Sequence, residues 1–170
     1  MSEVEHLVVM GVSGSGKTTV ARILAERLDR PFAEADDLHP ATNIAKMSAG
    51  TPLSDADRLP WLRAIRDRLT AQARAGRSTV VTCSALKVAY RDVLREAEGR
   101  VRFVHLTGTI GTIDRRVSAR SDHFMPPALL ASQFDALEPL TPTEDGVVVP
   151  VTLSPEAVAD AALSALAATA

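Results

Sequence analysis

Residues 11–18 read GVSGSGKT, and this stretch decides the fold. An apolar run, HLVVMG at residues 6–11, precedes it and predicts a buried parallel strand. The segment that follows, KTTVARILAERLD at residues 17–29, has apolar residues at helical spacing. A glycine, four residues and then Gly-Lys-Thr, placed between a strand and a helix, match the phosphate-binding loop (P-loop) in full.

The chemistry of this loop follows from its residue types. Its glycines allow the backbone to turn successive N–H groups toward phosphates, and the next helix adds the positive end of its dipole. Lys17 is expected to reach the β- and γ-phosphates of ATP, and the Thr18 hydroxyl to bind Mg²⁺. The predicted ATP-binding residues are Gly11, Val12, Ser13, Gly14, Ser15, Gly16, Lys17 and Thr18.

Composition limits the classes of function. With 170 residues, 46% apolar and 24% charged, residues 1–170 are expected to form one globular domain. The formal net charge of −2 argues against a nucleic-acid coat protein, so the expected partner is a small molecule. A single cysteine, Cys83, suits a reducing compartment, and we find no signal-peptide pattern or membrane-spanning apolar run. A cytoplasmic protein without a membrane partner is expected.

Strand and helix signals alternate along the rest of the chain. Pro60 is expected in the first turn of a helix that Ser54 opens, and Ser154 and Pro155 begin the last helix. Alternation of this kind predicts an α/β fold with a parallel sheet, helices on both faces and ligands beyond the carboxyl ends of the strands. The further strands are expected within residues 30–40 and at 78–86, 101–108 and 146–151, and the further helices at 54–76, 88–99, 112–120, 128–140 and 154–169.

A carboxylate stands where the second strand should end, in AEADDLHP at residues 33–40. Asp36 or Asp37 could face the γ-phosphate and accept the proton of an acceptor hydroxyl, and a turn or helix cap is an equal alternative. After the strand at 78–86 we find Ser84 instead of the aspartate with which motor-type NTPases hold Mg²⁺. This difference favours a small kinase, in which Asp36 could serve the metal through water.

Cationic side chains follow the same strand ends. Lys87 and Arg91, together with Ser84, could reach the cleft and suit a carboxylate substrate. Taken alone, their spacing of four residues is more typical of a solvated helix face. Arg58 stands at a helix start, where anions are favoured, so it could bind a ligand or pair with a neighbouring aspartate.

A segment with arginines beside it has the composition of a closing lid. Arg115, Arg116 and Arg120 precede SDHFMPP at residues 121–127. A lid excludes water and brings cations to the transferring phosphoryl group, and surface arginines are the alternative interpretation.

Four stretches together resemble the P-loop type of gluconokinase. They are MGVSGSGKTTVA at residues 10–21, DDLHPATNIAKMSAGTPLSDADRLPWL at 36–62, CSALKVAYRDVLR at 83–95 and HFMPPALLASQFDALEPL at 123–140. The resemblance implies ATP-dependent phosphorylation of D-gluconate at its 6-hydroxyl, giving 6-phosphogluconate. It also implies the three-layer P-loop kinase fold of the nucleoside-monophosphate-kinase type, a mobile lid at about residues 115–130 and a possible homodimer.

The resemblance also implies roles for single residues. Asp36 would act at the acceptor hydroxyl, with Lys17 and Arg120 as the other catalytic residues. One departure is the string Glu34-Ala35-Asp36, in which alanine replaces a glycine that is frequent in relatives. The implied substrate-binding residues are Asp36, His39, Arg58, Ser84, Lys87, Arg91, His123 in the lid and Gln133 in the helix after it.

Two other functions are consistent with these residues. A related small-acid kinase of the shikimate type would need the same loop and carboxylate, with a pocket shaped for a ring. A regulatory module that binds nucleotide without transferring phosphate is the alternative from another class. The apolar residues between Trp61 and Ala75 could form a dimer face or pack on the sheet.

Overall fold

A computed structural model describes residues 3–118 and 127–170 of the chain. Its strands are β1 Glu5–Met10, β2 Phe32–Glu34, β3 Thr79–Thr82, β4 Arg100–Thr107 and β5 Gly146–Pro150. They form one parallel sheet in the order β2-β3-β1-β4-β5. The three central strands are largely buried, which explains why their sequences are nearly continuous apolar runs.

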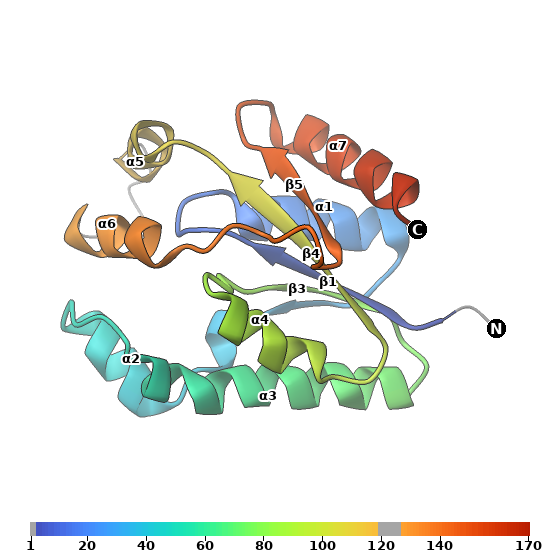
Figure 1. The fold of residues 1–170 in the computed structure, drawn as a ribbon, viewed down its shortest axis with the longest axis horizontal. Coiled ribbons are helices and arrows are strands. Elements are labelled where there is room, and N and C mark those ends of the chain that lie inside the picture. The colour runs from blue at the N-terminus through green and yellow to red at the C-terminus, as the bar shows by residue number, and fades with distance from the viewer. Residues whose placement is uncertain (1–2, 119–126) are drawn as a thin grey trace.

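Helices cover both faces of this sheet. α1 and α7 lie on one face and α3 and α4 on the other, so the described residues form three layers (Figure 1). α2, α5 and α6 lie at the end of the sheet toward which the strands point (Figure 1). The helices are α1 Lys17–Leu28, the 3-10 helix η1 Ala35–Leu38, α2 Ala41–Ser48, α3 Asp55–Arg74, α4 Val88–Arg95, α5 Ile110–Ser118, α6 Pro127–Ala136 and α7 Pro155–Ala168.

Each face of the sheet has its own apolar core. On one face, Leu7 of β1 packs in a cluster with Leu24 of α1 and Ala162 of α7. On the other face, the next residue, Val8, belongs to a cluster with Ile65 of α3. Successive side chains of a strand point to opposite faces, so the central strands serve both clusters.

The predicted three-layer α/β architecture is confirmed, and four local details differ from expectation. Pro60 is the sixth residue of α3 and not part of its first turn, because a capping box of Ser54 and Asp57 starts the helix at Asp55. The helix expected at 88–99 ends at Arg95, and the helix expected at 128–140 ends at Ala136. α2 was not predicted, because a helix of only eight residues is too short to show helical periodicity in the sequence.

The apolar side chains of α3 pack into the core. Trp61, Leu62, Ile65 and Leu69 are each at most 2% exposed. The dimer face that these residues could have formed is therefore not available, and core packing is the correct interpretation. Across the residues that the structure describes, no helix combines the length and apolar character that a membrane crossing needs.

Candidate active site

The loop between β1 and α1 has the geometry that phosphate binding requires. Gly16 has a φ of 90° immediately before the first residue of α1. Gly11 has a φ of 146°, and a Cβ there would lie 2.8 Å from the carbonyl oxygen of Leu106 and 2.9 Å from Ser15 Oγ. Glycine, which has no Cβ, allows the positive φ at both positions and the close approach at Gly11. Gly16 at the N-cap has no side chain to bind the first N–H groups of α1, so these groups can bind an anion.

Lys17 is half-buried against this loop. Its Nζ donates to the carbonyl oxygens of Gly11 at 3.1 Å and Val12 at 3.0 Å. Burial lowers the pKa of Lys17, and the nearby carboxylates of Asp36 and Glu34 oppose this shift. The ammonium therefore lies over the loop, where phosphate oxygens can replace the two carbonyls.

Glu34, at the end of β2, connects two hydroxyl groups beside the loop. One carboxylate oxygen accepts from Thr18 Oγ1, and the other accepts from Thr82 Oγ1 at 2.9 Å. Glu34 is thus the carboxylate beside the predicted Mg²⁺ ligand, a position that the sequence suggested for Asp36. Among the described residues no three His, Cys, Asp or Glu side chains gather as a metal site. The hydroxyl–carboxylate pair suits a hard cation completed by phosphate oxygens and water.

A cavity of about 280 Å³ opens beside the loop. This volume is near the lower end of small-molecule pockets, about 300 Å³. η1 turns the chain after β2 so that Asp36, and not Asp37, contributes to the lining. The lining residues are Ser13, Lys17, Asp36, His39, Met47, Thr51, Pro52, Leu53, Arg58, Trp61, Ser84, Ser132 and Gln133.

An aromatic pair forms one side of the cavity. The His39 ring stacks on Trp61, with ring centroids 4.1 Å apart and an interplanar angle of 14°. Trp61 Nε1 donates to the carbonyl oxygen of Ala35 at 2.7 Å, which connects α3 to η1. Burial lowers the pKa of His39, with Asp36 opposing the shift and Arg58 reinforcing it. Burial and Arg58 thus favour the neutral imidazole.

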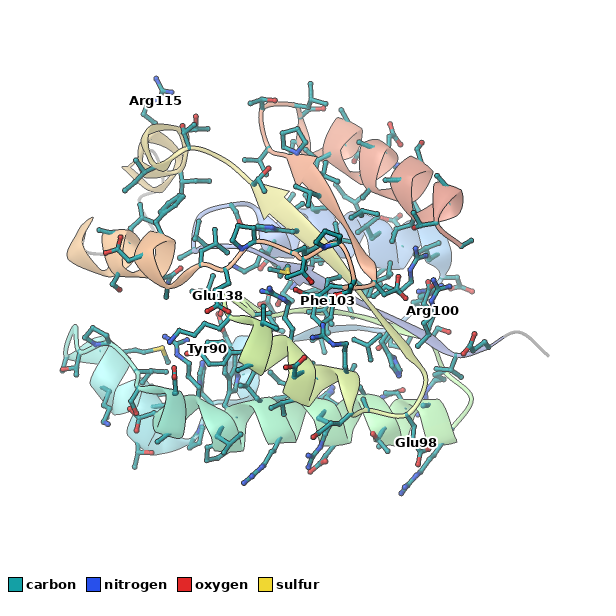
Figure 2. The ribbon with its side chains drawn as sticks, in the orientation of Figure 1. Tyr90, Glu98, Arg100, Phe103, Arg115 and Glu138 are labelled. Carbon is teal, nitrogen blue, oxygen red and sulfur yellow. The ribbon has the colours of Figure 1, made fainter. Side chains whose placement is uncertain are left out.

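Arg58 brings a positive charge to the cavity from the start of α3. Its Cζ lies 5.5 Å from the centroid of the Tyr90 ring, and its buried Nε has no hydrogen-bond partner within the described residues. Tyr90 points from α4 toward α3 (Figure 2), and its hydroxyl donates to Asp55. Asp55 also accepts from Lys87 Nζ at 3.0 Å. Because Lys87 and Tyr90 engage Asp55, the Arg58 guanidinium stays available for an anionic ligand.

Two predicted cations lie outside the cavity lining. Lys87 pairs with Asp55 at 3.0 Å, and neither residue lines the cavity. The prediction that Arg91 binds the substrate needs correction. Its side chain is fully buried and binds Glu144 through Nε at 2.6 Å and Nη2 at 3.0 Å. Arg91 Nη1 also donates to the carbonyl oxygen of Ala85 at 2.7 Å. Ala85 has a φ of 45°, so Arg91 stabilises the strained turn after Ser84 and does not contact a ligand there.

α6, one of the segments after β4, contacts the phosphate-binding loop and contributes to the cavity lining. The Oε1 of Gln133 in α6 accepts from the backbone N–H of Ser13 at 2.7 Å, which joins α6 to the phosphate-binding loop. Arg115 is exposed and projects outward from α5 (Figure 2). Arg120 and His123 lie outside the described residues, as does most of the expected lid.

The structure adds Glu34, Trp61 and Tyr90 to the residues predicted from sequence. The signal for Glu34 was its place at the end of the second strand, because ligands of a parallel sheet gather beyond the carboxyl ends of its strands. Trp61 and Tyr90 lie on helices with apolar faces, where an aromatic residue is expected in the core. Cys83 is buried packing as predicted, and burial raises the pKa of its thiol to about 12.

Comparison with known proteins places this site among small-molecule kinases. The AAA domain family matches residues 7–140. The chain is 51% identical over 145 residues to gluconokinase of Gluconobacter oxydans, covering 85% of the chain and 80% of that relative. It is 47% identical over 144 residues to thermosensitive gluconokinase of Escherichia coli, covering 85% and 77%. A gluconokinase structure from Sinorhizobium meliloti matches with a TM-score of 0.90 and 44% identity, covering 100% of this chain and 95% of that one.

Proposed function

Because the chain belongs to the gluconokinase family, it is a phosphotransferase, and we propose that it transfers the γ-phosphoryl group of ATP to the 6-hydroxyl of D-gluconate. The observation that carries this proposal is one cavity lined by Lys17, Asp36 and Arg58. A sugar acid needs a cation for its carboxylate, and a kinase needs a carboxylate for the acceptor hydroxyl and a cation for the phosphates.

The proposed step moves one phosphoryl group and one proton. The 6-hydroxyl oxygen forms a bond to the γ-phosphorus, while the bond to the β–γ bridging oxygen breaks and that oxygen leaves on ADP. Asp36 positions the hydroxyl and accepts its proton. Lys17 balances the charge that develops on the phosphoryl oxygens. Holding both substrates in one cavity makes the transfer effectively unimolecular.

The same residues suit a magnesium ion. Thr18 and Glu34 would hold it beside the phosphate-binding loop, with Glu34 acting directly or through water. When bound, Mg²⁺ neutralises oxygens of the β- and γ-phosphates. Glu34 also accepts from Thr82, which orients the carboxylate toward Thr18.

Other residues of the cavity are proposed to orient the substrate. Arg58 would bind the gluconate carboxylate, with Lys87 as a second cation if it leaves Asp55. His39, Ser84 and Gln133 would bind hydroxyl groups. Arg120 and His123 remain predictions for a lid at about residues 115–130 of a single kinase domain.

The test is ADP release with ATP and Mg²⁺, measured with D-gluconate, with shikimate and with other sugar acids. We expect turnover that depends on gluconate and falls by at least about 100-fold in Asp36→Asn, because the carboxylate that accepts the proton is lost. Asp37→Asn is the matched control, since Asp37 does not line the cavity. Turnover with shikimate alone would favour the shikimate-type kinase. ATP binding without any acceptor-dependent turnover would favour the regulatory module.

Location and assembly are part of the proposal. A cytoplasmic location is supported by the single buried cysteine. A homodimer is also proposed, on the resemblance alone, and measurement of molecular mass in solution tests it. No nucleic acid is proposed as a partner, given the formal net charge of −2.

A further inference from the structure

The amide of Asn43 is oriented by a backbone carbonyl. Asn43 Nδ2 lies 2.9 Å from the carbonyl oxygen of Asp57 and 3.2 Å from Nδ1 of His39. A carbonyl oxygen can only accept a hydrogen bond, so the Asn43 atom beside it must be the NH₂ group and not the amide oxygen. Asn43 is 2% exposed, so this orientation is held within the protein.

The orientation of this amide determines where the proton of His39 lies. The NH₂ group has two N–H bonds, one for the Asp57 oxygen and one directed to His39 Nδ1. A proton on Nδ1 would place two donors face to face, so Nδ1 must accept. A neutral imidazole has one ring proton, which is therefore on Nε2.

We propose that Asn43 is a positioning residue that holds His39 as its Nε2–H tautomer, so that the imidazole donates a hydrogen bond to an oxygen of the bound sugar acid. The role toward the sugar acid rests on the proposed function, whereas the tautomer does not. His39 is then no base for the reaction, because Asn43 covers its unprotonated nitrogen. The proton of the acceptor hydroxyl goes to Asp36, in the same cavity.

The surroundings of His39 agree with a neutral ring. The charged groups that act on it are Asp36 in η1 and Arg58 in α3, and they have opposite effects on its pKa. Burial adds to the effect of Arg58 and lowers the pKa. The stack on Trp61 fixes the plane of the ring, and within this plane the 3.2 Å contact with Asn43 Nδ2 selects the Nδ1 edge.

The first experiment needs only the unliganded wild-type protein. Long-range ¹H–¹⁵N correlation spectra at pH 7.5 distinguish protonated from unprotonated imidazole nitrogens, and His39→Gln assigns the signals among the four histidines. We expect an unprotonated Nδ1 and a protonated Nε2 for His39. A protonated Nδ1 would overturn the proposal, whether or not the protein phosphorylates gluconate.

The second experiment changes the partner of Nδ1. Asn43→Asp places a carboxylate there, so we expect the Nδ1–H tautomer and a KM for gluconate raised about tenfold, with a smaller change in kcat. Lys46→Ala is the matched control, because it removes the 2.8 Å ion pair of α2 with Asp57 and leaves Asn43 in place. This control should keep the Nε2–H tautomer and a KM within about twofold of wild type.

Two results would contradict the positioning role. One is an unchanged tautomer in Asn43→Asp. The other is an equal rise of the KM in Lys46→Ala, which would mean that the attachment of α2 alone matters. Absence of gluconate turnover in the wild type would instead overturn the proposed function and leave the tautomer measurement valid.

Discussion

Arg91→Met tests whether this arginine supports the fold or binds the substrate. Arg91 is 0% exposed and its partner Glu144 is 4% exposed. Removing one member of a buried ion pair costs about 3–5 kcal/mol, because the other charge stays buried without its partner. We therefore expect the free energy of unfolding to fall by this amount, a large share of the roughly 5–15 kcal/mol typical of a domain.

The pKa of Glu144 reflects the same interaction together with two further hydrogen bonds. Burial alone would raise it, but hydrogen bonds from Arg91, the Thr141 N–H and Arg95 lower it from 4.5 to about 2. A depression of this size corresponds to about 3 kcal/mol. Because the folded-state pKa is lowered, the stabilisation is complete above about pH 4.5 and is lost as the pH falls toward 2. Most of this pH dependence should disappear in Arg91→Met.

The assay is urea unfolding at 25 °C followed by circular dichroism, together with the KM for gluconate of the folded variant. Arg95→Met is the matched control, since Arg95 contacts the same carboxylate at 3.0 Å but is 28% exposed. It should lose no more than about 1 kcal/mol. If Arg91→Met were within about 1 kcal/mol of wild type and raised the KM more than tenfold, Arg91 would be a substrate ligand and our reasoning would be refuted.

Three further predictions concern the cavity and its surroundings. Arg58→Met should raise the KM for gluconate about 10- to 100-fold and change the KM for ATP little, because a charge-assisted hydrogen bond to the carboxylate is lost; an equal rise in both constants would contradict this role. Glu34→Gln should raise the Mg²⁺ concentration for half-maximal activity about tenfold, measured by Mg²⁺ titration at saturating gluconate, and an unchanged requirement would remove Glu34 from the metal site. Cys83 should react with a thiol reagent only after unfolding, because burial raises its pKa to about 12, and rapid modification of the native protein would show that the thiol is accessible.

The sequence by itself determined the phosphate-binding loop and the order of strands and helices. These features depend on local properties, such as the positive φ of Gly16 and the capping box of Ser54 and Asp57. The last helix likewise begins at Pro155 with Ser154 as its cap, as predicted. α2 escaped prediction because its eight residues contain only two large apolar side chains, Ile44 and Met47, and such a stretch is too short to show helical periodicity.

Only the tertiary structure decided which charged residues face the cavity. Arg58 and Arg91 were both candidates in sequence. In the structure Arg91 binds Glu144, a carboxylate 53 residues away, while Lys87 and Tyr90 both donate to Asp55, the aspartate near Arg58. Local sequence specifies a side chain's charge and its place on a helix. The partner of that charge comes from distant segments brought together by folding, and burial then decides whether the charge holds the protein together or remains available for a ligand.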